Sequence, residues 1–358
     1  MKIAVLGANG FVGGHILRFL RAHGHDARAV VRRPPAVPDA DHRIADACDV
    51  YAVRDAFTGC DFVVHAALGS DDVIVDSTAP VYAAAEGAGV RRLVYISTGS
   101  VHGQAPAPGT DERSPLSIRQ AVPYNNAKVR AERKLQRLRE RGTVELVMLR
   151  PTIVFGPGSR WIFDFADRLR TRTAYVVDGA RGICNSIYVE NLAHAVGLAL
   201  TAPDVDREVF LVSDAELVRW CDLYRPIADA LGVDFDRVPS LSPPEPRSTL
   251  KQRYVDPLRT SELVRALIRH TPGHVKDVVK RAIRRGRPGA VREPSPSISA
   301  GPMQVSASDV PAEIAALQRC RWRLPNDKAA RILGYVPPVP FAEGCRRSIE
   351  WLAERGAA

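Results

Sequence analysis

Tyr124 and Lys128 stand four residues apart in the segment 122–141, whose composition favours a helix throughout. This spacing places both side chains on one face of a helix. A free tyrosine has a pKa of about 10, and an ammonium group held nearby favours the phenolate and lowers that pKa. Such a tyrosine can exchange a proton with a carbinol oxygen while a hydride moves to or from a nicotinamide ring. The pair therefore predicts oxidoreductase chemistry, and an ordinary surface pair is the alternative.

The beginning of the chain predicts the dinucleotide site that this chemistry needs. Residues 3–6 form an apolar run typical of a strand buried in a parallel sheet, and a helix-patterned segment follows. Between them, Gly7 allows a tight turn, Gly10 lets the backbone approach a pyrophosphate, and Gly13 lets helix and strand pack closely. The helix N-terminus offers unpaired N–H groups to the phosphates. The cofactor contacts predicted from this turn are Gly7, Gly10, Phe11, Val12 and Gly13.

Arg32 and Arg33 follow the second predicted strand, residues 27–31. Dinucleotide folds place here the residue that meets the adenosine ribose. An acid hydrogen-bonds the 2′-hydroxyl of NAD, whereas an arginine accommodates the 2′-phosphate of NADP. Two arginines and no acid favour NADP over NAD as the cofactor; the alternative is that both are solvated loop charges.

The chain then keeps alternating between strand and helix patterns, which predicts an α/β fold with a doubly wound parallel sheet. Ligands of such sheets bind at the carboxyl ends of the strands. Ala66 and Ala67 follow one predicted strand, and Ser97 and Thr98 follow the next. We expect these four residues to lie at the dinucleotide site.

The length of 358 residues allows one nucleotide-binding domain with a smaller α/β substrate lobe built on it. The predicted Rossmann domain comprises residues 1–155, and 185–215 return to it. The predicted substrate lobe comprises 156–184 and 216–358, including a basic insertion at about 240–318.

Composition limits the function classes further. No apolar run is long enough to span a bilayer, and Lys2 leads directly into a strand, so we expect a cytoplasmic protein without an integral membrane segment. The six cysteines are scattered without metal-ligand spacing, which predicts reduced thiols and no metal site. Residues 241–300 hold 13 Lys and Arg against 5 Asp and Glu, most of the net charge of +10. This points to a local anionic contact, and no nucleic-acid partner is expected because no aromatic-interleaved basic motif is present.

Seven stretches in order carry a family resemblance: GANGFVG at 7–13, DACD at 46–49, VVHAA at 63–67, YISTGSVHG at 95–103, PYNNAKVRAE at 123–132, LRPTIVFGPG at 149–158 and SIYVENLAHA at 186–195. Together they resemble the extended branch of the short-chain dehydrogenase/reductase superfamily, the NAD(P)-dependent epimerase/dehydratase-like enzymes. The segment 327–344 is similar to the closing segment of this family. The resemblance covers the chain except about 240–318, and it implies a Rossmann fold and a homodimer.

The resemblance also implies roles for individual residues. Tyr124 is the catalytic acid/base, Lys128 is its pKa-lowering and ribose-binding partner, and Thr98 hydrogen-bonds the reacting oxygen. Asp46 meets the adenine. The other implied cofactor positions are Ala47, Ala66, Ala67, Ser97 and Pro151, and the substrate positions are Gly99, Ser100, Ile153 and Arg160, whose guanidinium is a candidate phosphate contact with solvated charge as the alternative.

Three departures from the family pattern narrow the activity. Gly99 and Ser100 stand where the 4,6-dehydratases carry an Asp-Glu pair, so dehydration is not expected. Ile153 stands where sugar-nucleotide epimerases commonly have an Asn that contacts the diphosphate, which speaks against a nucleotide-linked sugar without excluding it. The helix predicted before Arg91 also lacks the family's usual Asn, whose position falls near Ile74.

A basic amphipathic helix is predicted over residues 271–286, beginning at a Thr-Pro pair and ending at a glycine. Its charged face suits a substrate diphosphate, an anionic membrane or a partner, and a solvated face is the alternative.

The first functional hypothesis is an NAD(P)-dependent oxidoreductase or epimerase acting at a sugar carbon. Its substrate would be phosphorylated, as in a nucleotide-linked sugar, and its activity that of a 4-epimerase or a 4-keto reductase. Arg32 and Arg33 favour reduction, because NADPH is the usual donor for net reduction. The runner-up is an NADPH-dependent reductase of a non-nucleotide ketone or hydroxysteroid-like alcohol. A non-catalytic NADP-binding sensor is the third reading, and the intact Tyr124–Lys128 pair speaks against it.

Overall fold

A seven-stranded parallel sheet organises the part of the chain that the computed structural model describes, residues 1–34, 41–244, 303 and 305–356. The strand order is β10-β6-β5-β4-β1-β2-β3. The strands are β1 (Lys2–Leu6), β2 (Asp26–Val31), β3 (His42–Ile44), β4 (Phe62–His65), β5 (Arg92–Ile96), β6 (Glu145–Pro151) and β10 (Val209–Val212). The order reverses between β1 and β4, and in sheets of this kind the ligand crevice lies at the carboxyl ends of the two strands at the reversal.

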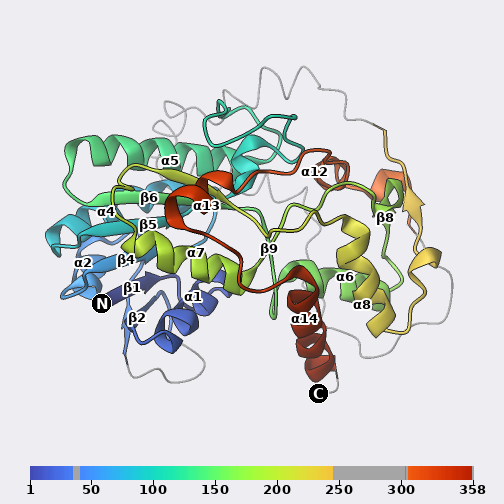
Figure 1. The fold of residues 1–358 in the computed structure, drawn as a ribbon, viewed down its shortest axis with the longest axis horizontal. Helices are drawn as coiled ribbons and strands as arrows, with labels where there is room; N and C mark the ends of the chain where they lie inside the picture. Colours follow the sequence, from blue (N-terminus) through green and yellow to red (C-terminus); the bar gives the residue numbers. More distant parts are fainter. Residues whose placement is uncertain (35–40, 245–302, 304, 357–358) are drawn as a thin grey trace, which may run out of the picture. The chain divides into compact units, whose positions relative to one another are not determined.

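Helices cover both faces of this sheet (Figure 1) because successive strand residues point to opposite sides. In β1, Ile3 and Val5 belong to one apolar core and Ala4 and Leu6 to the other. The first core is completed by α1 (Phe11–Ala22), α7 (Val189–Thr201) and α13 (Asp327–Leu333). The second core is completed by α2 (Val50–Phe57), α3 (Asp71–Asp76), α4 (Thr78–Gly87) and α5 (Pro123–Arg141). The predicted doubly wound Rossmann fold is confirmed.

A third apolar core lies around Trp220, which is fully buried. It joins α6 (Arg160–Arg170), α8 (Trp220–Ala230) and α14 (Phe341–Gly356) to the short parallel pair β7 (Ile153–Phe155) and β9 (Ser186–Tyr188). Beside it lie β8 (Val176–Val177), which pairs with β11 (Ser240–Leu241), and α12 (Ala312–Gln318). The described residues also include four short 3₁₀ helices: η1 (Gly99–His102), η2 (Asp178–Ala180), η3 (Phe235–Arg237) and η5 (Ala307–Asp309).

Strand β8 is short. It comprises Val176 and Val177, and the positive φ angles of Asp178, Gly179 and Ala180, 47°, 70° and 55°, end it. Nothing tests the predicted domain boundary near residue 155, which stays a prediction.

Two units make up the chain: Met1–Pro243 with Ile298–Ala358, and Pro244–Ser297. The second unit, with the helix predicted at 271–286 and most of the basic insertion, lies outside the described residues. Within the described ranges, no helix combines the length and apolar character needed to cross a membrane. The same ranges contain no group of three or more His, Cys, Asp or Glu side chains placed to hold a metal ion.

Candidate active site

The glycine turn after β1 lies directly against the end of β4. Gly7 has a φ of 91°, a region that favours glycine. A methyl group added at Gly7 would lie 2.6 Å from the amide nitrogen of Ala67 and 2.9 Å from the carbonyl carbon of Ala66. A methyl group at Gly13 would lie 2.2 Å from the carbonyl oxygen of Gly7. Both approaches therefore require glycine, and the structure brings the turn and the Ala66–Ala67 pair together at the crevice.

The N-terminus of α1 opens from this turn. Gly10 is the N-cap residue, and the first helical hydrogen bond runs from the Gly14 amide to the Gly10 carbonyl oxygen at 2.8 Å. The amides of residues 11–13 therefore have no intrahelical acceptor and carry the positive end of the helix dipole. Gly10 has ordinary extended backbone, with φ of −80°, and its exposed position leaves the backbone accessible. The glycine cradle and these amides fit the pyrophosphate of a dinucleotide.

Arg32 and Arg33 lie at the end of β2 with exposed side chains. The side-chain amide of Asn9 donates to the carbonyl oxygen of Arg33 at 2.9 Å, which ties the glycine turn to this strand end. Asp46 is exposed and accepts from the Cys48 amide, while its neighbour Ala47 is buried. The structure thus places the predicted adenosine contacts on the β2–β3 side of the crevice.

Thr98, Ser100 and Tyr124 meet at the end of β5. The Thr98 hydroxyl accepts from the Ser100 amide at 3.2 Å and lies 3.0 Å from the Ser100 hydroxyl. Burial raises the pKa of Tyr124 to about 12, and a hydrogen bond with Thr98 offsets part of this increase. The sequence-based expectation of a lowered tyrosine pKa is therefore wrong in direction for this structure.

The contacts of Lys128 explain why its ammonium group does not lower the pKa of Tyr124. Its ammonium group donates to the carbonyl oxygen of Ile96 at 2.8 Å and to the Tyr95 hydroxyl at 3.2 Å, so it is held by β5 and not by the phenol of Tyr124. Burial lowers the pKa of Lys128 to about 8, and Glu132 opposes this shift. The two side chains do share one face of α5, but the phenol remains protonated at neutral pH.

A buried polar network fixes α5 behind these residues. Ser97 donates to Glu132, and Arg150 forms an ion pair with Glu132 at 2.7 Å. Arg150 also approaches His102 Nε2 at 3.1 Å. Arginine only donates, so this nitrogen accepts and the imidazole is neutral; burial and Arg150 lower the His102 pKa to about 4. Ser97, predicted as a cofactor contact, is 3% exposed and engaged in this network.

A segment that the motifs did not single out reaches the same strand end. Residues 319–326, here called the strap, place the Leu324 side chain beside Gly99: a methyl group on Gly99 would lie 3.1 Å from Leu324 Cδ1. It would also lie 3.4 Å from the carbonyl oxygen of Pro151, which ends β6. Leu324 is 4% exposed, and its amide donates to Asn185 Oδ1 at 2.8 Å. A buried leucine side chain therefore lies next to the Thr98–Ser100 segment.

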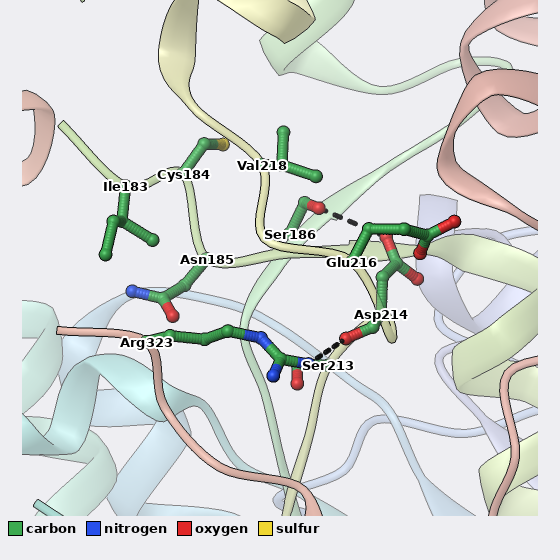
Figure 2. A pocket seen from close by; sticks show the side chains of 9 residues that line it. All are labelled: Ile183, Cys184, Asn185, Ser186, Ser213, Asp214, Glu216, Val218 and Arg323. Atoms are coloured by element: carbon green, nitrogen blue, oxygen red, sulfur yellow. Dashed lines mark hydrogen bonds between the residues drawn. The ribbon is translucent and has the colours of Figure 1, made fainter. Parts of the chain in front are cut away.

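Asp214, just beyond β10, holds the strap through its backbone oxygen (Figure 2). Arg323 donates to the backbone oxygens of Asp214 and Ala215, each at 2.9 Å. The Asp214 carboxylate accepts from Ser186 at 3.1 Å and from the Tyr188 amide at 2.9 Å. These hydrogen bonds connect β9 to the segment that follows β10 through the buried Asp214 carboxylate.

The two remaining predicted substrate residues occupy different settings. Ile153 begins β7 and is half-buried. Arg160 begins α6 with 90% of its side chain exposed, and it forms an ion pair with Asp164 at 3.4 Å. Sequence reasoning gave no role to Tyr95 or Leu324. Tyr95 carries a polar group within an apolar strand, which is a readable signal, whereas the Leu324 contact depends on the tertiary fold.

Together, the parallel sheet and the glycine turn at its switch point define an α/β fold of the dinucleotide-binding class, with Tyr124 and Lys128 near the end of β5. Residues 3–213 match the family described as NAD dependent epimerase/dehydratase. The chain is 32% identical over 221 residues to 3-diazoavenalumate denitrifying reductase of a Streptomyces species. This alignment covers 56% of this chain and 72% of that protein. The chain is 31% identical over 254 residues to 2-alkyl-3-oxoalkanoate reductase of Stenotrophomonas maltophilia, with coverages of 65% and 76%.

The chain therefore belongs to the NAD dependent epimerase/dehydratase family and is an enzyme of the extended short-chain dehydrogenase/reductase type. The crystal structure of UDP-glucose 4-epimerase with UDP-glucose from Thermotoga maritima has a TM-score of 0.67 against this chain at 18% identity, covering 99% of each. This likeness concerns the fold alone.

Proposed function

We propose that this enzyme reduces the carbonyl group of an apolar, non-nucleotide ketone with NADPH. The observation that carries the proposal is the buried Leu324 side chain beside Gly99, which makes this flank of the Thr98–Ser100 segment apolar. Two nearby arginines are committed elsewhere: Arg150 pairs with Glu132, and Arg323 binds backbone carbonyl oxygens. The two similar reductases support the same proposal, since the name of the second, 2-alkyl-3-oxoalkanoate reductase, describes an alkyl-substituted oxo acid as its substrate class.

The proposed mechanism follows from the protonation states of the site. A bound nicotinamide supplies the hydride. Tyr124 keeps its proton at neutral pH and donates it to the carbonyl oxygen as negative charge develops there. Thr98, which hydrogen-bonds Tyr124, orients the same oxygen. Lys128 remains largely cationic below its pKa of about 8 and binds the cofactor ribose. The exposed pair Arg32 and Arg33 binds the 2′-phosphate of NADPH.

A nucleotide-linked sugar is the second candidate, as substrate of a 4-epimerase or a 4-keto reductase. The specific observation in its favour is the match of residues 3–213 to the family described as NAD dependent epimerase/dehydratase. The half-buried Ile153 and the exposed Arg160 count against it, because neither offers a buried polar contact to a diphosphate.

A substrate panel tests the two candidates. Purified enzyme is incubated with NADPH or NADH and 2-alkyl-3-oxo acids or cyclic ketones, and separately with UDP-glucose in the presence of NAD. We expect NADPH consumption with the apolar ketones and no epimerisation, and we expect Tyr124→Phe to abolish turnover while retaining cofactor binding. Epimerisation of UDP-glucose without ketone reduction refutes the proposal, and full activity in Tyr124→Phe removes this residue from the mechanism.

We also propose that the enzyme is a homodimer paired through α4 and α5. A groove of about 530 Å³ runs along these helices, and its lining includes Tyr82 and Leu138 with charges of both signs, Glu86 and Arg137. Two copies of such a face can pair isologously. Sedimentation of the wild type against Leu138→Glu tests this: a dimer that becomes a monomer supports the proposal, and a monomeric wild type overturns it.

A further inference from the structure

The ammonium group of Lys128, a residue of α5, is buried against β5. An ammonium has three N–H donors. One is directed to the carbonyl oxygen of Ile96 at 2.8 Å and a second to the Tyr95 hydroxyl at 3.2 Å. Lys128 is 3% exposed and Tyr95 1% exposed, so solvent does not replace either acceptor. The two contacts leave the third donor for a group in the crevice.

Tyr95 holds this ammonium in two ways at once. Besides the hydrogen bond from Lys128 Nζ to its hydroxyl, its ring centroid lies 4.7 Å from the same nitrogen. The face of an aromatic ring attracts a cation, most strongly where water is excluded. Tyr95 therefore stabilises the charged form of Lys128 against the cost of burial.

The other titratable groups around this pair come from two elements. Burial raises the pKa of Tyr95, and Glu132 and Tyr124, which lie on α5, add to this increase. Glu132 is already paired with Arg150. His65, from β4, meets the Tyr95 ring edge-on at 5.3 Å, and burial together with Lys128 lowers its pKa to about 3. It is neutral at physiological pH. The hydrogen bond from the ammonium to a side chain goes to the Tyr95 hydroxyl.

We propose that Tyr95 is a positioning residue whose hydroxyl and ring hold the Lys128 ammonium at the dinucleotide crevice and thereby set the affinity for the cofactor ribose. The inference rests on the proposed ribose-binding role of Lys128. It goes beyond that role because it assigns the orientation and charge of the lysine to a residue on another element, outside the Tyr124–Lys128 motif.

Titration of NADPH into the intact enzyme from pH 6 to pH 9, followed by nicotinamide fluorescence, tests the proposal. In the wild type we expect the affinity to fall as the pH rises through about 8, where Lys128 loses its proton. Tyr95→Phe keeps the ring and removes the acceptor. A hydrogen bond to a charged group is lost, so we expect the midpoint to move about one pH unit lower and NADPH to bind about tenfold more weakly at pH 8. Tyr95→Leu also removes the ring and moves the midpoint further.

Tyr82→Phe is the matched control. Tyr82 is also 1% exposed, and its hydroxyl donates to the carbonyl oxygen of Val144 at 2.8 Å, away from Lys128. We expect this variant to lose stability without any shift of the pH midpoint. An unshifted midpoint in Tyr95→Phe, or an equal shift in Tyr82→Phe, overturns the proposal.

Lys128→Met distinguishes failure of the Tyr95 proposal from failure of the ribose-binding role of Lys128. If this variant loses the pH dependence and binds NADPH weakly while Tyr95→Phe behaves as wild type, only the role of Tyr95 is refuted. If Lys128→Met binds NADPH as tightly as the wild type at every pH, the ribose-binding role of Lys128 fails and the Tyr95 proposal fails with it.

Discussion

Acid should destabilise this enzyme through His65, a buried imidazole behind the active site. His65 is 2% exposed, its Nε2 lies 3.4 Å from the Ser77 hydroxyl, and its Nδ1 has no hydrogen-bond partner among the described residues. Burial, and next Lys128, lower its pKa from 6.5 to about 3. Because the folded pKa lies below the unfolded one, the unfolded chain binds the extra proton first as the pH falls. Stability attributable to His65 is therefore intact above pH 6.5 and is lost progressively from there to about pH 3.

The size of this loss follows from proton linkage. Between pH 7 and pH 5 the unfolded chain becomes almost fully protonated at this site while the folded chain remains neutral, which costs about 2 kcal/mol of unfolding free energy. His65→Phe keeps a ring in the pocket and removes the titration. We therefore expect the variant to lose about 2 kcal/mol less than the wild type over this interval, whatever its stability at pH 7.

Urea unfolding at pH 7, 6 and 5, followed by circular dichroism, measures this difference. His23→Gln is the control, because the His23 side chain is exposed at the end of α1. We expect its pH dependence to match the wild type. Parallel curves for the wild type and His65→Phe, with equal losses between pH 7 and pH 5, would refute the assignment of a low pKa to His65.

Three further changes have expected outcomes. Arg32→Asp should move the ratio of NADPH to NADH affinity by at least about tenfold toward NADH, measured by titration of both, because a charge-assisted bond to the 2′-phosphate is lost; an unchanged ratio would contradict it. Gly13→Ala places a methyl group 2.2 Å from the Gly7 carbonyl oxygen; we expect loss of measurable NADPH binding and about 2 kcal/mol of stability in urea unfolding. Arg92→Lys removes donors to the carbonyl oxygens of residues 199, 200 and 202 at the end of α7; we expect about 2 kcal/mol lower stability by urea unfolding, with unchanged NADPH affinity.

Much of the fold could be predicted from the sequence because its signals are local. The apolar run before Gly7 and the helical pattern after Gly13 are contiguous in the chain, and the turn between them admits few conformations. The common face of Tyr124 and Lys128 follows from helix geometry alone. The carboxyl ends of parallel strands meet at one edge, which is why the residues after β4 and β5 also lie near the turn.

The protonation state of Tyr124 was not predictable in the same way. Spacing on a helix gives proximity, but the direction in which Lys128 points depends on acceptors from β5. Tyr95 and the Ile96 carbonyl take its donors, and burial then dominates the pKa of the phenol. The contact of Leu324 with Gly99 is likewise set by the strap, whose path depends on long-range hydrogen bonds such as that with Asn185.

The raised pKa of Tyr124 favours reduction over oxidation as the direction of the proposed reaction. A phenol with a pKa of about 12 is present as the acid at neutral pH and is ready to protonate a carbonyl oxygen, whereas oxidation of an alcohol needs the scarce phenolate. Lys128, with a pKa of about 8, loses its charge first as the pH rises. We therefore expect the lysine, and not the tyrosine, to set the alkaline limit of the proposed ketone reduction. Because β5 supplies acceptors for the Lys128 ammonium, we expect substitutions in this strand to move that limit.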